Sequence, residues 1–394
     1  MKVSTVETLV LRAQPAQTYW GARAWRAGLD VPTGQYPPLE RRRYLYSDTI
    51  DAVLVRIEAA DGTVGWGEAK APVGARATAA IIDDLLAPLV IGTGLDEISN
   101  TWDRMYAGMR VRGHDSGFWL EAIAGIDIAL WDALGRHCGQ ALTTLIGGRY
   151  RDEVPVYASG IPGAQAGSGA SGQAQVRDEA QRMRDSGFTA VKVAIGAGRE
   201  DDIASVETVR DAMGAMATIL VDAAGQYDLP DALRVGHALV DAGVGFFEMP
   251  LPPEDIGGYA RLARRVDVPL ALDSVCTRHR ALEFLRAGAL HVLQPDVCRA
   301  GGITESMRIA QLADAFGAQA TPHVSIGSAV HIAASISCAA AIPNFSILEE
   351  WTGSNPLREI AADCPEVVDG RYAVPTKAGL GISVDQAVVR RMAA

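Results

Sequence analysis

Three short segments decide the fold that this sequence predicts: ILVDAAG at residues 219–225, GFFEMPLP at 245–252 and PLALDSV at 269–275. Each segment is an apolar run that ends in a carboxylate, and these carboxylates, Asp222, Glu248 and Asp273, are 26 and 25 residues apart. That spacing corresponds to one strand and one helix per carboxylate. Because the carboxyl ends of parallel strands meet on one face of a barrel, we expect the three acids to converge there.

The same alternation of apolar strands and amphipathic helices begins at Val154 and continues to Glu349, which is typical of repeated βα units. The predicted strands are 154–159, 190–195, 218–222, 245–248, 270–273, 291–294, 318–321 and 346–349. Eight strands are the number that a closed barrel needs. A Gly/Ser/Ala-rich stretch, residues 162–173, follows the first strand and is interpreted either as a loop over the barrel mouth or as a tolerated surface insertion.

The first part of the chain has a different pattern, an antiparallel meander followed by helices. The strands are expected at 3–12, 49–59 and 64–68, with a turn at Asp61-Gly62, and the helices at 75–89, 98–108 and 118–137. This order predicts an α+β lobe. Residues 367–388 again look strand-like and are expected to rejoin that lobe. We therefore predict a capping domain at 1–125, completed by about 367–394, and a barrel domain at 126–366.

The composition is that of a globular protein: 48% of the 394 residues are hydrophobic and 21% are charged. The formal net charge is −11, and the longest basic run is Arg41-Arg42-Arg43, so nucleic acid is not expected as a partner. A small anionic substrate stays compatible with this acidity, because a bound divalent cation can reverse the field of a site.

Five cysteines are scattered through the chain without a CxxC pair, at positions 138, 276, 298, 338 and 364. We interpret them as reduced thiols of a cytoplasmic protein. The amino terminus, MKVSTVETLVLR, alternates like a strand and lacks the pattern of a signal peptide. No apolar run reaches the roughly 18 to 20 residues of a membrane span, so no membrane partner is expected.

The three strand-end carboxylates predict a metal site. Three carboxylate oxygens with water completing an octahedron suit Mg²⁺, and no Cys or His stands among Asp222, Glu248 and Asp273 to favour zinc. Each acid alone would more often be a strand-end residue or a helix N-cap. Three acids in the same register favour the metal site.

The later strands also end in polar residues: Asp296, His323 and Glu349, at separations of 23, 27 and 26 residues counted from Asp273. His323 follows Asp296 by one βα unit, so the aspartate can accept the Nδ1–H, fix the tautomer and raise the basicity of the imidazole. Lys192 ends the second strand. It is interpreted as a base with a depressed pKa, as an electrostatic clamp for a substrate carboxylate, or as a solvated surface lysine.

The ordered set of motifs resembles the enolase superfamily, in its mandelate racemase and muconate lactonising branches. The run at 118–148, with GIDIALWDALGR and LIGGR, is similar to the junction between the capping domain and the barrel of that superfamily. The resembling strand ends are VKVAIG, LVDAAG, FFEMPLPPED, PLALDS, LQPDVCRAGGIT, TPHVSIG and SILEE, and the late pattern is PLRE…VVDGRYAVPTKAGLGISVD. The likeness covers essentially the whole chain.

This resemblance implies an α/β protein, a modified TIM barrel (β/α)7β with an α+β capping domain. It implies Mg²⁺ on Asp222, Glu248 and Asp273, and it implies His323 with Asp296 as the acid/base dyad. It also implies an even-numbered homo-oligomer that acts on a small-molecule carboxylate.

The resemblance further implies that Glu349 is a hydrogen-bonding or electrophilic partner of the substrate carboxylate. Loops of the capping domain would select the substrate, and the candidate contacts are Tyr19, Trp20 and Trp25.

Three positions depart from the mandelate racemase pattern. The second strand has Lys-x-Ala instead of Lys-x-Lys, because residue 194 is Ala. The third metal ligand is Asp273. Mandelate racemases have Glu at this position, whereas the lactonising branch also has Asp. Ala224 replaces the Asn that is common in the group.

We therefore expect Mg²⁺-dependent removal of the proton α to a carboxylate, with His323 as the base. A sugar-acid dehydratase, acting on an aldonate or aldarate, ranks first because one base is enough for β-elimination of water. A cycloisomerase of a sugar-acid lactone ranks second. A racemase or epimerase ranks third, because Lys192 would have to replace the absent second lysine. A non-catalytic carboxylate-binding protein or structural oligomer is the alternative from another class, and unchanged thermal stability with and without Mg²⁺ would favour it.

Overall fold

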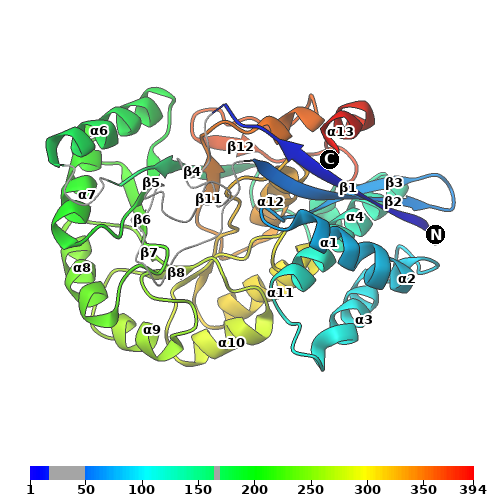
Figure 1. Cartoon of the computed structure of the whole chain (residues 1–394), viewed down its shortest axis with the longest axis horizontal. Helices are drawn as coiled ribbons and strands as arrows, with labels where there is room; N and C mark the ends of the chain where they lie inside the picture. Colours follow the sequence, from blue (N-terminus) through cyan, green and yellow to red (C-terminus); the bar gives the residue numbers. More distant parts are fainter. Residues whose placement is uncertain (17–48, 164–168) are drawn as a thin grey trace.

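The computed structural model describes residues 1–16, 49–163 and 169–394, and it contains a barrel beside a smaller lobe (Figure 1). The barrel strands are β4 (Glu153–Ile161), β5 (Ala190–Ala194), β6 (Thr218–Asp222), β7 (Phe247–Glu248), β8 (Leu270–Leu272), β9 (Val292–Leu293), β10 (Gln319–Ala320) and β11 (Leu348–Trp351). Neighbouring strands pair in parallel from β11 through β4 to β10. The eight predicted barrel strands are confirmed.

Seven helices connect these strands and surround them: α6 (Gly169–Asp185), α7 (Arg199–Met213), α8 (Leu229–Asp241), α9 (Ile256–Ala263), α10 (Arg278–Arg286), α11 (Gly302–Ala315) and α12 (Ala329–Ala341). Helix α6 begins inside the segment 162–173 that was predicted to be a loop, so that prediction is wrong from Gly169 onward. The buried positions Val176, Ala180 and Met183 show why, because their spacing places them on one helical face against the barrel. Residues 164–168 lie outside the described part of the chain.

The barrel closes between β10 and β11 without a strand ladder. The amide of Ala320 donates to the carbonyl of Asn344 (3.1 Å), and the hydroxyls of Thr321 and Ser346 lie 2.7 Å apart. The strands themselves are short, and the functional side chains stand at or just beyond their carboxyl ends.

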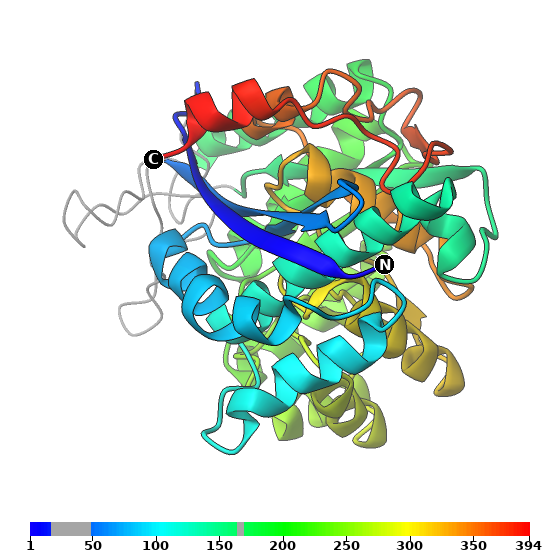
Figure 2. The same ribbon diagram turned by 90° about the vertical axis from the view of Figure 1, so that its right-hand side faces the viewer.

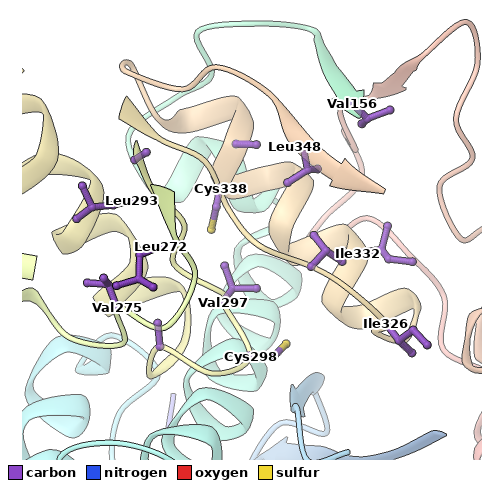
Figure 3. Close-up of a cluster of buried hydrophobic side chains, with 14 of the residues drawn as sticks. Val156, Leu272, Val275, Leu293, Val297, Cys298, Ile326, Ile332, Cys338 and Leu348 are labelled. Carbon is purple, nitrogen blue, oxygen red and sulfur yellow. The ribbon is translucent and has the colours of Figure 1, made fainter. Parts of the chain in front are cut away.

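The main core lies between the barrel strands and the surrounding helices, and Figure 3 shows a part of it. Leu272, Leu293 and Leu348 come from the strands and lie near Ile332 and Cys338 of α12. All five side chains are buried, so this layer fixes the positions of the strand ends.

The smaller lobe contains an antiparallel sheet of three strands, β1 (Val3–Ala13), β2 (Ile50–Ala59) and β3 (Val64–Ala69). The helical elements beside it are α1 (Ala75–Ile81), the π-helical turn η2 (Ile82–Leu86), α2 (Ala87–Val90), α3 (Ile98–Arg110) and α4 (Phe118–Cys138). The single helix predicted at 75–89 is therefore interrupted by a π turn. The predicted α+β lobe is confirmed.

Helix α4 packs against the sheet at very short range. A Cβ atom added to Gly67 of β3 would lie 2.0 Å from the carbonyl oxygen of Gly125, so only glycine permits this approach. The predicted domain boundary between residues 125 and 126 falls in the middle of this helix, and the boundary stays a prediction.

Helix α4 also carries two buried aspartates that fasten it to other parts of the fold. Asp127 accepts hydrogen bonds from the amide (3.0 Å) and hydroxyl (2.6 Å) of Thr304 in α11. Asp132 accepts from the amides of Trp66 in β3 and Leu380 near the C-terminus. The helix therefore joins lobe, barrel and C-terminal segment.

The C-terminal segment is only partly a strand. The short 3₁₀ helix η3 (Pro356–Ile360) precedes β12 (Arg371–Ala373), which pairs antiparallel with β4 of the barrel rather than with the lobe. The last helix, α13 (Gln386–Met392), contacts β1, and Ala393 after it bridges to Leu11 near the end of that strand (Figure 2). Asp385 caps this helix by accepting from the amides of Ala387 and Val388. The predicted return to the lobe is thus made by a helix, where a strand was expected.

Candidate active site

The strand ends bring the predicted residues together at one end of the barrel. Lys192 of β5 lies with its Nζ 2.8 Å from Glu248 Oε2, 3.2 Å from Glu349 Oε1 and 3.8 Å from Asp222 Oδ2. Lys192 is 3% exposed, so the third predicted interpretation, a solvated surface lysine, is wrong. Residues of four strands therefore meet around one ammonium group.

The charges around Lys192 determine its protonation. Burial lowers the pKa of Lys192, but the opposing effect of the Glu248 and Glu349 carboxylates is larger. The resulting pKa is well above the usual value. This direction favours the electrostatic clamp over a base with a depressed pKa.

The carboxylates are also arranged as a cation site. Ligand atoms of Glu248, Asp273 and His323 lie within 4.8 Å of one another. Burial raises the pKa of Glu248, and the negative charges of Asp222, Asp273 and Glu349 add to this in spite of Lys192. A divalent cation would relieve that repulsion.

One orphaned atom supports the fit to a metal. Asp273 Oδ1 is buried and has no hydrogen-bond partner among the described residues, while Asp273 Oδ2 accepts from Arg299 Nη1 (3.1 Å). A buried carboxylate oxygen without a partner is costly unless a cation or water satisfies it. The oxygen-rich donor set suits Mg²⁺.

Asp222, the remaining predicted ligand, is on the strand next to Glu248 but outside that group of three. Its Oδ1 accepts from the amide of Ala224 (2.8 Å). The set Asp222, Glu248 and Asp273 therefore stays a prediction, with the last two drawn together by the fold and Asp222 beside them.

His323 and Asp296 face each other across neighbouring strand ends. His323 Nδ1 lies 3.0 Å from Asp296 Oδ2, and His323 Nε2 lies 3.3 Å from Glu349 Oε2. Nε2 is also 3.8 Å from Asp273 Oδ2. It therefore points at the carboxylate cluster, which consists of Asp222, Glu248, Asp273 and Glu349. With Asp296 on Nδ1, the imidazole can expose Nε2 as the proton acceptor.

Asp296 is strongly held as an anion. Burial raises the pKa of Asp296, but Lys70, His331 and the hydrogen bond from His323 lower it by more. The pKa therefore lies well below the usual range. His331 Nε2 is 3.1 Å from Asp296 Oδ1, although neither ring nitrogen of His331 has a partner in hydrogen-bond geometry.

Glu349 is fixed by backbone amides. Its Oε2 accepts from Val324 N (3.1 Å) and Ser325 N (2.7 Å). Burial raises the pKa of Glu349, but Lys192 and His323 lower it below the usual value, so the group is an anion in this structure. Glu349 therefore contacts both Lys192 and His323.

Strained backbone surrounds the site. Ala224, Met249 and Ser325 each follow a barrel strand and have φ of 46°, 40° and 51°, in the left-handed region that glycine prefers. Strain of this kind is characteristic of functional sites held by their surroundings.

Four residues that contact the site were not predicted from the sequence: Lys70, Gln294, Arg299 and His331. Gln294 Nε2 donates to Glu248 Oε2 (3.1 Å). Lys70 follows β3 of the lobe, and its Nζ lies 2.8 Å from Asp296 Oδ2. The sequence held one signal for Lys70, the rarity of lysine in this chain. Only four of the 36 Lys and Arg residues are lysines, at positions 2, 70, 192 and 377. Lys70 and Lys192 are the two that are buried, at 8% and 3% exposure.

The predicted substrate contacts Tyr19, Trp20 and Trp25 lie outside the described residues. No helix in the described ranges combines the length and apolarity needed to cross a bilayer.

Two protein families match this chain. The family described as "Mandelate racemase / muconate lactonizing enzyme, N-terminal domain" matches residues 46–147, and "Enolase C-terminal domain-like" matches residues 175–388.

Characterised relatives extend over most of the chain. D-galactarolactone cycloisomerase of Agrobacterium fabrum is 36% identical, over 85% of this chain and 89% of that protein. Arabinonate dehydratase of Saccharolobus solfataricus is 32% identical, over 86% of this chain and 90% of that protein. The solved structure of the 3,6-anhydro-D-galactonate cycloisomerase from Zobellia galactanivorans superposes with a TM-score of 0.84 at 25% identity, covering 100% of both chains. This chain therefore belongs to the mandelate racemase and muconate lactonizing enzyme branch of the enolase superfamily.

Proposed function

We propose that this protein catalyses β-elimination from the carboxylate of a sugar acid, with His323 as the single base. The observation that carries the proposal is the one-sided arrangement of the site. His323 Nε2 is directed into the carboxylate cluster, whereas the second strand offers only Lys192, which is paired with Glu248 and Glu349. Position 194, where a second lysine would supply an opposing base, is Ala194.

Mg²⁺ is the proposed cofactor, held by Asp222, Glu248 and Asp273. When bound, it would supply the positive charge that makes the proton α to a carboxylate removable. Side chains of the site bind the substrate carboxylate and transfer the proton.

Lys192 supplies a fixed cation for the substrate carboxylate, because its pKa is raised and its position is set by two acids. Fixed charges of this kind stabilise negative charge as it develops, without reorganisation during the reaction. Asp296 holds Nδ1 of His323, so that Nε2 accepts the α-proton. The C–H electron pair becomes the new C=C bond as the β-substituent leaves.

The leaving group distinguishes two reactions of the same site. If a hydroxyl leaves, His323 returns its proton to that oxygen, water departs, and the enol tautomerises to a 2-keto-3-deoxy acid. Relatives named arabinonate dehydratase and D-galactonate dehydratase support this reading, at 32% and 30% identity. We place dehydration first, because one base on one face is enough for it.

If a ring oxygen leaves, the same step opens the ring and the product keeps all its atoms. The 36% identity to D-galactarolactone cycloisomerase specifically favours this second candidate. Racemisation has no comparable support, since an opposing base is not present at position 194.

Two further properties belong to this proposal. We propose an even-numbered homo-oligomer, following the superfamily resemblance. We also propose a cytoplasmic enzyme, supported by five cysteines that are all free thiols in the structure.

The test is ¹H NMR in D₂O with Mg²⁺ against aldonates, aldarates and their lactones. A monodeuterated methylene at C3 would establish dehydration, and a ring-opened isomer with deuterium at the exchanged carbon would establish cycloisomerisation. His323→Asn should abolish either reaction while Mg²⁺ binding, measured by calorimetry, stays within threefold of the wild type. Turnover that survives in His323→Asn would overturn the assignment of the base.

A further inference from the structure

Lys70 reaches the base from the other domain. It follows β3 of the capping domain, and its backbone amide donates to the carbonyl of Cys298 in the barrel (3.1 Å). Two residues earlier, Glu68 accepts from the amides of Ser328 (3.1 Å) and His331 (3.3 Å). The end of β3 is therefore attached to the barrel at Glu68 and at the backbone of Lys70 itself.

The ammonium group of Lys70 contacts Asp296 directly and the backbone next to His323. It donates to Asp296 Oδ2 (2.8 Å), the same oxygen that faces His323 Nδ1 (3.0 Å). It also donates to the carbonyl of Val324 (2.7 Å), the residue that directly follows His323. One side chain thus holds the carboxylate of Asp296 and the backbone of the residue that follows His323.

The remaining contacts leave Asp296 little freedom. Its Oδ1 accepts from the amide of Cys298 (2.9 Å) and lies 3.1 Å from His331 Nε2. Lys70 and His323 alone fix the second oxygen among the described residues. Loss of Lys70 would leave that oxygen to His323 and remove the only side-chain contact on the Val324 carbonyl that the structure shows.

We propose that Lys70 is a positioning residue for His323, so that the orientation of the base depends on a residue supplied by the capping domain. This inference rests on the proposed function in taking His323 as the base. Lys70 does not touch the carboxylate cluster that would receive the substrate, and it acts through Asp296 and Val324. A misplaced base slows proton transfer, since a displacement of about 1 Å can cost on the order of 100-fold in rate. Substrate binding should stay nearly unchanged, because Lys70 acts through Asp296 and Val324.

The experiment compares full-length, Mg²⁺-loaded wild type with Lys70→Met, Lys70→Arg and the control Lys377→Met. Lys377 is an exposed lysine that pairs with Asp363 and contacts no residue of the site within the described ranges. Its loss therefore tests the general effect of removing a lysine. With the substrate found by NMR, kcat and KM are measured for the ordinary and α-deuterated acid.

Lys70→Met should lower kcat by about 100-fold while KM changes by less than about threefold, and the deuterium isotope effect on kcat should rise because proton abstraction becomes the slow step. Lys70→Arg should recover part of kcat, since arginine can donate to both oxygens, and Lys377→Met should match the wild type. An unchanged kcat in Lys70→Met, or a lower kcat with an unchanged isotope effect, overturns the inference. If Lys70→Met does not fold, the same readouts on Lys70→Gln decide.

A second readout needs no substrate and separates this inference from the proposed function. In ¹⁵N-histidine NMR, the Nδ1–H proton of His323, assigned by its loss in His323→Asn, should exchange with water at least about tenfold faster in Lys70→Met. An unchanged exchange rate overturns the positioning role even if the wild type turns over no acid in the panel. Absence of turnover by itself would count only against the proposed function.

Discussion

Replacing Asp127 by Asn should make the stability of this protein less dependent on pH. Asp127 is fully buried in α4, and burial raises its pKa to about 7, in spite of hydrogen bonds from Thr304 that lower it. The pKa in the unfolded chain is near 3.8, so between pH 4 and pH 7 the folded state binds a proton that the unfolded state does not. The stabilisation from this proton is complete below the unfolded pKa and is lost as the pH rises through about 7.

The size of the effect follows from the pKa. At pH 5.5, which is 1.5 units below the folded pKa, the proton contributes about 2 kcal/mol, since one unit corresponds to about 1.4 kcal/mol. At pH 8.5 the contribution is close to zero. Asparagine has no titrating proton and can still accept from the Thr304 amide and donate to its hydroxyl, so the wild type should gain about 2 kcal/mol over Asp127→Asn on acidification from pH 8.5 to 5.5.

Urea unfolding of both proteins at the two pH values measures this difference, and all other titrating groups cancel in the comparison. Asp178→Asn on the exposed face of α6 is the matched control, and its stability relative to the wild type should not change with pH. A difference between the wild type and Asp127→Asn that is the same at both pH values would refute the reasoning, because the buried carboxyl would then not carry a raised pKa.

Three other perturbations test the fold and the metal site. Mg²⁺ at 100 times its dissociation constant should stabilise the protein by about 2.7 kcal/mol in thermal unfolding, and Asp273→Asn should lose most of that gain; equal melting temperatures with and without Mg²⁺ in the wild type would contradict the proposed cation site. Gly67→Ala should destabilise the protein by about 3 kcal/mol or more in urea, because its Cβ would meet the Gly125 carbonyl, whereas Gly257→Ala in α9, whose added Cβ meets nothing closer than 3.9 Å, should be neutral or mildly stabilising. Tyr372→Phe should cost about 1–3 kcal/mol in the same assay by removing the hydroxyl that donates to the buried Glu350, and no loss would mean that Glu350 is satisfied by Arg358 alone.

The barrel was predictable because its information is local. Each strand is an apolar run that ends in a polar residue, and the polar residues at Asp222, Glu248 and Asp273 follow from that pattern without knowledge of the rest of the fold. The start of α6 at Gly169 was not predictable in the same way. Its glycine, serine and alanine residues have weak local preferences, and the packing of Val176 and Ala180 against the barrel decides for helix.

The rarity of lysine could have singled out Lys70, but its contact with Asp296 could not be predicted, because the two residues are 226 positions apart in the sequence. No periodicity in GWGEAK indicates that this strand end meets Asp296 rather than solvent. The C-terminal helix α13 carries a readable cap, Asp385, but the preceding GISV alternates like a strand and directed the prediction toward a strand.

The buried helix α4 limits how this protein can be divided. Its residues pack on the sheet at Gly67, on α11 through Asp127 and on the C-terminal segment through Asp132, so it is as much a part of one domain as of the other. A fragment that stops inside it would expose apolar surface on both pieces. Chimaeras that exchange capping domains between relatives should therefore be joined after Gly148 and before β4, so that the whole helix travels with the cap and its Thr304 and Leu380 partners are matched in the recipient barrel.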